Sequence, residues 1–221
     1  MTKNKNQTLN STRATIQATP RATPGATNVV EVPSRVSTDV RAQRKGHKGG
    51  VLWFTGLPGS GKSTLAIELE RKLFDESYNV YVLDGDNVRR GLNSDLGFLP
   101  QERFENIRRV GEVAALMADS GLITIAAFIS PYQSDRDRAR EAAGNGFHEI
   151  AIKADLKTCE GRDPKGHYKR ARSGDIPDFT GVSAPYEEPQ APDLIIDTAK
   201  FEVEECVKQL FDYVVQEFSL G

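Results

Sequence analysis

The chain has 221 residues, enough for one substantial domain with a core and at most a short appendage. Residues 1–48 carry nine Lys and Arg against two acidic residues, so the formal net charge of −2 leaves residues 49–221 strongly acidic and excludes non-specific nucleic-acid binding there. Two cysteines without CxxC spacing exclude a disulfide framework or zinc site, and no apolar run approaches the ~20 residues that span a membrane.

Residues 1–48 also differ from the rest in composition. They are rich in Thr, Asn, Pro and Ala and show no sustained apolar period, so they bury too little surface to offset the entropy lost on ordering. We therefore predict a flexible basic tail at 1–48 and one folded domain at 49–221. The first thirty residues lack acidic side chains, as transit peptides do, but their sparse arginine and missing helical apolar face favour a plain tail and a cytoplasmic location.

Short apolar segments alternate with helical patterns along the folded domain. In chain order, we predict strands at 51–55, 80–83, 122–129, 149–153 and 194–196, and helices at 63–77, 100–120, 134–143, 156–161 and 203–218. This alternation predicts an α/β fold of three layers, in which a mostly parallel five-stranded sheet lies between helices. A ligand crevice is expected at the carboxyl ends of the strands.

The segment GLPGSGKST joins the first predicted strand to the first helix. It satisfies the pattern G-x-x-x-x-G-K-[ST], whose backbone N–H groups and helix N-terminus face phosphate oxygens. Lys62 is expected to reach the β and γ phosphates, and the Ser63 hydroxyl can ligate Mg²⁺. The pattern predicts a P-loop NTPase-type fold that binds ATP and Mg²⁺ through Gly56, Leu57, Pro58, Gly59, Ser60, Gly61, Lys62, Ser63 and Thr64.

The segment DGDNVRR follows the second strand and carries two carboxylates. On a strand, Asp84 and Asp86 point to one side, where one can hold magnesium and the other can accept a proton from an attacking hydroxyl. The alternative is a turn of hydrogen-bonding residues. Ser130, after the third strand, is open to three roles: orienting an acceptor or a magnesium water, being phosphorylated, or ending the strand.

Basic residues gather near these strand ends. Arg89 follows the carboxylates, and Arg103 and Asn106 share one face at the start of the next helix, which suits an anionic acceptor. Arg108 and Arg109 are expected to be surface or salt-bridging residues. The basic segment 162–181 is either a flap that closes over the triphosphate, with an exposed Phe179 stacking on a flat ring, or a solvated charge run.

In order, the P-loop, LDGDNVRRGLN, DLGF, ERFENIRRVGEVA, FISPY, DPKGHYKRARSG and FTG resemble the adenylyl-sulfate kinase (APS kinase) family over residues 48–216. The resemblance implies phosphorylation of the 3′-hydroxyl of adenosine 5′-phosphosulfate by ATP with Mg²⁺, and catalytic roles at Lys62, Asp84, Asp86 and Ser130, with Ser63 and Asp84 at the metal. It implies that Phe98 and Phe179 flank the acceptor's adenine. The full set of implied acceptor contacts is Asp86, Asn87, Arg89, Phe98, Arg103, Asn106, Ile129, Ser130, Lys165 and Phe179.

Two departures from the family pattern lie in the flap, where His167 replaces a leucine and Pro177-Asp178 replaces Lys-Gly; both bear on closure. Relatives often form homodimers and some are fused to a sulfurylase, so the resemblance implies a homodimer and a possible sulfurylase partner. Two alternatives stay open: a P-loop kinase for another small acceptor, such as a nucleoside monophosphate or sugar acid, and a non-catalytic ATP-binding regulator of a sulfate-activating complex.

Overall fold

The computed structural model describes residue 30 and residues 32–220. The chain divides into two units between Arg35 and Val36, and the helices and strands of the described residues belong to the second unit. In chain order these are α1 (Thr38–Lys45), β1 (Gly50–Thr55), α2 (Lys62–Asp75), β2 (Val80–Asp84), α3 (Gly85–Arg89), α4 (Pro100–Asp119), β3 (Ile123–Ala127), α5 (Gln133–Ala143), the 3₁₀ turn η1 (Gly144–Gly146), β4 (Phe147–Lys153), α6 (Leu156–Arg162), α7 (His167–Arg172), β5 (Leu194–Asp197) and α8 (Val203–Phe218). Within the described part, no helix is long and apolar enough to cross a membrane.

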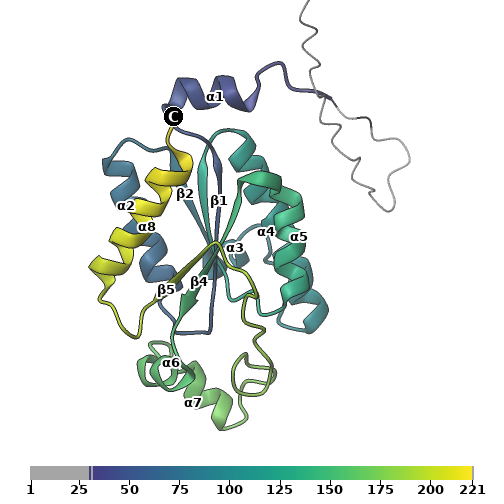
Figure 1. The fold of residues 1–221 in the computed structure, drawn as a ribbon. Helices are drawn as coiled ribbons and strands as arrows, with labels where there is room; N and C mark the ends of the chain where they lie inside the picture. Colours follow the sequence, from purple (N-terminus) through teal and green to yellow (C-terminus); the bar gives the residue numbers. More distant parts are fainter. Residues whose placement is uncertain (1–29, 31, 221) are drawn as a thin grey trace, which may run out of the picture. The chain divides into compact units, whose positions relative to one another are not determined.

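The strands form one five-stranded parallel sheet in the order β2-β3-β1-β4-β5. Helices α2 and α8 cover one face and α4 and α5 cover the other, while α6 and α7 lie beyond the carboxyl ends of the strands (Figure 1). The predicted three-layer α/β fold is thus confirmed. Because β1 is the central strand, the loop that follows it begins at the middle of the sheet edge, as in other parallel sheets that bind ligands at this edge.

The central strand is buried over all six residues, since helices cover both of its faces. Leu52 and Phe54 point into the core on the α2 and α8 side, and Val51 and Trp53 point into the core on the α4 and α5 side. This alternation fixes β1 from both faces. The loop at its carboxyl end therefore starts from a rigid base.

The compact unit begins earlier in the chain than the sequence indicated. Ser37 caps α1 by accepting a hydrogen bond from the backbone of Val40, and Gly46 ends the helix in the left-handed conformation at φ 78°. His47 is 2% exposed, and its Nε2 accepts a 2.9 Å hydrogen bond from the backbone N–H of Asn79. Residues 36–48 of the predicted tail thus belong to the compact unit, whereas residues 1–29 of that tail lie outside the described residues.

Candidate active site

The P-loop curls around the side chain of Lys62, the first residue of α2. Lys62 is 8% exposed, and its Nζ donates to the backbone oxygens of Gly56 at 2.9 Å and Leu57 at 2.8 Å. Gly59, at φ 76°, takes a conformation that side chains disfavour, and a Cβ there would lie 2.9 Å from the backbone oxygen of Cys159. The loop is therefore a tight cradle whose backbone N–H groups and helix N-terminus suit phosphate.

Burial makes Lys62 an unusually weak base. Loss of solvent lowers the pKa of the Lys62 ammonium to about 8, and the nearby Cys159 and Asp84 only partly oppose this effect. Its hydrogen-bond partners are neutral carbonyl and hydroxyl oxygens, which stabilise the charge less than an anion would. The site thus presents a desolvated ammonium that gains most from an anionic ligand.

Ser63 and Asp84 meet beside this cradle. The Ser63 hydroxyl donates to Asp84 Oδ2 at 2.7 Å, and Asp84 Oδ1 accepts from the backbone N–H of Asp86 at 3.0 Å. Two hard oxygen ligands from two elements fit Mg²⁺, which binds few protein groups and keeps several waters. Among the described residues, no group of three or more His, Cys, Asp or Glu is placed to hold a metal ion.

The prediction that Asp84 and Asp86 point to one side of a strand is wrong. The strand ends at Asp84, which caps the short helix α3, and Asp86 lies in the first turn of that helix. Capping overrides strand alternation here because the Asp84 side chain satisfies a free N–H group of α3. As a result Asp86 faces away toward the flap, where it forms an ion pair with Lys165.

Near Asp86, an arginine side chain stacks on an exposed aromatic ring. The Arg89 guanidinium lies 4.5 Å from the centre of the Phe98 ring, which is 67% exposed, and donates to the backbone oxygens of Leu96 and Gly97. Burial and the nearby Arg103 lower the pKa of Arg89. Two guanidinium groups that repel each other next to an exposed ring form a surface suited to an anionic, aromatic ligand.

Arg103 joins the two segments that carry the predicted adenine contacts. Its Nε donates to the backbone oxygen of Phe98 at 2.7 Å, and its Nη2 donates to the backbone oxygen of Asp178 at 2.7 Å. Asn106, one turn along α4, is 4% exposed, and its Oδ1 accepts from Asn93 at 3.0 Å. Arg103 thus lies among the predicted acceptor residues, whereas Asn106 is buried behind them.

The remaining predicted acceptor residues differ in exposure. Asn87 in α3 and Lys165 are exposed, Ile129 is half-buried, and Ser130 is 1% exposed. The Ser130 hydroxyl accepts a 3.0 Å hydrogen bond from the indole N–H of Trp53. The hydroxyl is therefore turned toward the core.

Surface pairing accounts for the next two arginines of α4. Arg109 forms ion pairs with Asp95 and Glu105 at 2.8 Å, and Arg108 pairs with Glu105 at 2.7 Å. These pairs confirm the predicted salt-bridging role. The two arginines lower the pKa of Glu105 to about 2.

The comparisons with known proteins agree with this geometry. The family model described as adenylylsulphate kinase matches residues 48–197. The chain belongs to the adenylyl-sulfate kinase family. A probable adenylyl-sulfate kinase of Halalkalibacterium halodurans is 55% identical over 188 residues, which cover 85% of this chain and 93% of the relative. The adenylyl-sulfate kinase of Geotalea uraniireducens is 58% identical over 172 residues, covering 77% of this chain and 83% of the relative.

A solved structure of the Mycobacterium tuberculosis APS kinase CysC, in complex with AMPPNP and APS, matches with a TM-score of 0.72. It is 45% identical, and the match covers 75% of this chain and 96% of that one. A gluconokinase from Sinorhizobium meliloti matches with a TM-score of 0.52 at 16% identity, covering 76% of this chain and 93% of that one, which shows the shared P-loop kinase fold alone.

The ring of the flap residue Phe179 was predicted to be exposed, but it is buried. Its ring is 8% exposed and packs edge-on against Tyr168, with 5.1 Å between ring centres, so the prediction of an exposed ring is wrong. The reason is a small core, at α6 and α7, in which Phe179 packs with Ala154, Cys159, Tyr168 and Ala171. Stacking of Phe179 on the acceptor stays a prediction.

Three residues support the P-loop through contacts that the sequence did not predict. The Tyr168 hydroxyl donates to the backbone oxygen of Pro58 at 2.9 Å, which links the flap to the loop. The Thr198 hydroxyl donates to the backbone oxygen of Ser60 at 2.8 Å, and Arg162 donates to Thr198 Oγ1 at 3.0 Å. The position of Thr198 just after a predicted strand was the one signal that could have found it.

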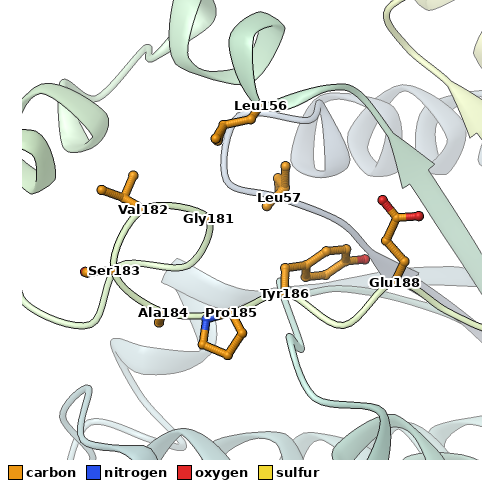
Figure 2. Close-up of a pocket in the computed structure, with 9 residues that line it drawn as sticks. All are labelled: Leu57, Leu156, Gly181, Val182, Ser183, Ala184, Pro185, Tyr186 and Glu188. Atoms are coloured by element: carbon orange, nitrogen blue, oxygen red, sulfur yellow. The ribbon is translucent and has the colours of Figure 1, made fainter.

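A cavity of about 510 Å³ borders the P-loop at Leu57. Figure 2 shows that Leu57, Leu156 and Val182 line one part of it, and that Tyr186 and Glu188 line another. Leu57 is the one lining residue that belongs to the predicted site. Lys62, Asp84 and Arg89 are not among the residues that line it.

Proposed function

We propose that this chain transfers the γ-phosphoryl group of ATP to the 3′-hydroxyl of adenosine 5′-phosphosulfate, yielding ADP and 3′-phosphoadenosine 5′-phosphosulfate. One observation carries the proposal. In a chain of this family, a phosphate cradle around Lys62 and a wall bearing Arg89 and Arg103 lie at the same carboxyl edge of the sheet. The cradle suits a triphosphate donor, and the wall suits an anionic acceptor with an aromatic base.

On the donor side, the P-loop N–H groups and Lys62 bind and orient the phosphates of ATP. Ser63 and Asp84 would hold Mg²⁺, which neutralises charge on the phosphates when it is bound. Phosphoryl transfer has a loose transition state, so most of the rate enhancement comes from placing and neutralising phosphate oxygens. Lys62 therefore contributes more to the rate enhancement than the group that accepts the proton of the attacking hydroxyl.

On the acceptor side, Asp86 is the stronger candidate for the base that accepts the 3′-hydroxyl proton. Both oxygens of Asp84 are already engaged, one by Ser63 and one by the backbone of α3. Asp86 is exposed, and its partner Lys165 fixes the carboxylate from the flap. Phe98, backed by Arg89, offers a face on which the acceptor's adenine stacks, and Arg103 holds the adjoining backbone in place.

We also propose a cytoplasmic location, a domain organisation and partners for this enzyme. Both cysteines, Cys159 and Cys206, are free and buried, which fits the reducing cytoplasm. A domain of residues 36–221 preceded by a basic tail, a homodimeric state and a sulfurylase partner complete the proposal. The last two rest on the family resemblance.

A coupled ADP-release assay with purified protein tests the function. We expect turnover with adenosine 5′-phosphosulfate, and little with AMP, a sugar acid or no acceptor. Preference for AMP or a sugar acid would favour the other small-acceptor kinase, and ATP binding without turnover would favour the regulator. Lys62→Ala is expected to lower kcat far more than Asp86→Asn, since charge placement outweighs proton removal.

A further inference from the structure

A buried arginine joins the end of β3 to a distant segment of the chain. Arg136, in α5, is 1% exposed and donates four hydrogen bonds of 2.6 to 2.8 Å. Its Nε binds Glu149 Oε1, and its Nη1 binds the backbone oxygen of Ser130. Its Nη2 binds both Gln133 Oε1 and the backbone oxygen of Glu187. The planar guanidinium thus fixes two backbone segments at once.

Ser130 needs such support because its backbone is strained. Its φ is 39°, in the left-handed region that non-glycine residues rarely adopt, and Pro131 follows it. Such a conformation persists only where its surroundings impose it. Here Trp53 binds the Ser130 hydroxyl, Arg136 binds its carbonyl, and the Thr55 hydroxyl donates to the preceding carbonyl of Ile129 at 2.7 Å.

The segment 186–187 is hydrogen-bonded to the residues that follow Ser130 and to Thr55. The Glu187 backbone N–H donates to the oxygen of Pro131 at 2.8 Å, and its carboxylate accepts from the Gln133 backbone N–H at 2.7 Å. The hydroxyls of Tyr186 and Thr55 share a 3.0 Å hydrogen bond. Arg136 lies between the two segments and binds both.

This support reaches the acceptor side of the site. In the sheet, Ala127 pairs with Asp84, so the segment after β3 runs beside the segment that carries Asp84 and Asp86. A Cβ on Gly85 would lie 3.5 Å from the Phe128 ring, which places the two segments in contact. The donor cradle, in contrast, is held by Lys62, Tyr168 and Thr198, whereas the four hydrogen bonds of Arg136 run to other residues.

We propose that Arg136 is a positioning residue for the acceptor: it holds the Ile129–Ser130 backbone and the 186–187 segment in the arrangement that binds the sulfated nucleotide, without touching either substrate. Glu149 is its counter-ion, 3% exposed on β4, and keeps the guanidinium oriented. This inference rests on the proposed function, because it names a determinant of acceptor binding in that reaction.

The test compares two conservative substitutions in one helix. Arg136→Lys keeps the charge, but a point-like ammonium cannot reach acceptors on Glu149, Ser130 and Glu187 together. We expect the KM for adenosine 5′-phosphosulfate to rise about tenfold or more, because small displacements in a site are costly, while the KM for ATP changes by less than about twofold. The matched control is Arg140→Lys, since Arg140 also pairs with Glu149 but binds neither Ser130 nor Glu187.

Trp53 adds a readout that is independent of turnover, because it is the only tryptophan in the chain and binds the Ser130 hydroxyl. Its emission maximum is expected to move more in R136K than in R140K, since Arg140 reaches Trp53 only through the Phe147 ring. Should R136K fail to fold, Gln133→Met removes one acceptor of Arg136 and is expected to raise the same KM about threefold.

An unchanged acceptor KM in the folded variant, equal rises in both KM values, or the same pattern in R140K would overturn the positioning role. A wild-type protein without activity toward the sulfated nucleotide would instead refute the proposed function. An active wild type with an unchanged KM ratio in the variants would refute only this inference.

Discussion

Binding of ATP is expected to weaken above pH 8 because it needs a protonated Lys62. The pKa of this ammonium is lowered to about 8 by burial, so the free protein loses the charge as the pH rises through that value. A bound triphosphate places negative charge next to Nζ, which raises the pKa again. Nucleotide binding therefore takes up a proton in alkaline solution.

The size of the effect follows from the fraction of Lys62 that is protonated. With a pKa of about 8, most of the free protein carries the charge at pH 7 and about one tenth does at pH 9, so affinity is expected to fall about tenfold across this interval. A further unit of pH weakens binding about tenfold again. The phosphates of ATP do not contribute, because their last protons are lost near pH 6.

Isothermal titration calorimetry with a non-hydrolysable ATP analogue measures this slope and, in buffers of different ionisation enthalpy, the proton uptake. Lys62→Arg is the matched control, since a guanidinium does not titrate in this range; its affinity is expected to be lower but level above pH 8. A wild-type affinity that stays constant from pH 7 to pH 9.5 would refute the view of Lys62 as a desolvated ammonium.

Three further predictions concern stability. Gly59→Ala is expected to lower the free energy of unfolding in urea by about 1–3 kcal/mol, because Gly59 has a positive φ and a Cβ would crowd Cys159. Gly91→Ala is the control, since a Cβ on Gly91 meets no atom within 4 Å, and an equal loss of stability in both variants would contradict this explanation. Asp86→Asn is expected to lower the Tm by no more than about 2 °C, since both members of its ion pair are exposed, and a larger drop would mean that it supports the fold. The folded-state pKa of Glu105 lies below its ordinary value of 4.5, so its contribution to stability is present above pH 4.5 and is lost as the pH falls toward 2. Glu105→Gln is expected to reduce the loss of unfolding free energy between pH 6 and pH 3 by about 1–2 kcal/mol. If the variant loses as much unfolding free energy as the wild type over this interval, the stabilising role of ionised Glu105 is contradicted.

The sheet and the P-loop could be predicted because their signals are local. Each central strand is an apolar run of the right length, and the glycines, Lys62 and Ser63 lie at fixed spacing between a strand and a helix. Helix α1 was missed because Ala42 is its only buried residue, so the apolar pattern is too weak and the caps at Ser37 and Gly46 define it instead.

The details of the site depend on contacts between distant segments. Phe179 stands in a polar sequence, and only packing against Tyr168 shows that its ring is buried. In α5, Arg136, Arg138 and Arg140 look alike in sequence, yet Arg136 is buried while Arg138 is exposed. The partners that decide this, on β4 and the segment at 187, are far away in the chain.

The proposed reaction is defined by where the phosphoryl group of ATP goes. Phosphorus NMR of the nucleotides, after incubation with ATP, Mg²⁺ and adenosine 5′-phosphosulfate, resolves the possible products. We predict ADP together with a new phosphomonoester on the 3′ oxygen of the sulfated nucleotide, in equal amounts. ADP accompanied only by inorganic phosphate, or a phosphoryl group added elsewhere on the acceptor, would contradict the proposed reaction.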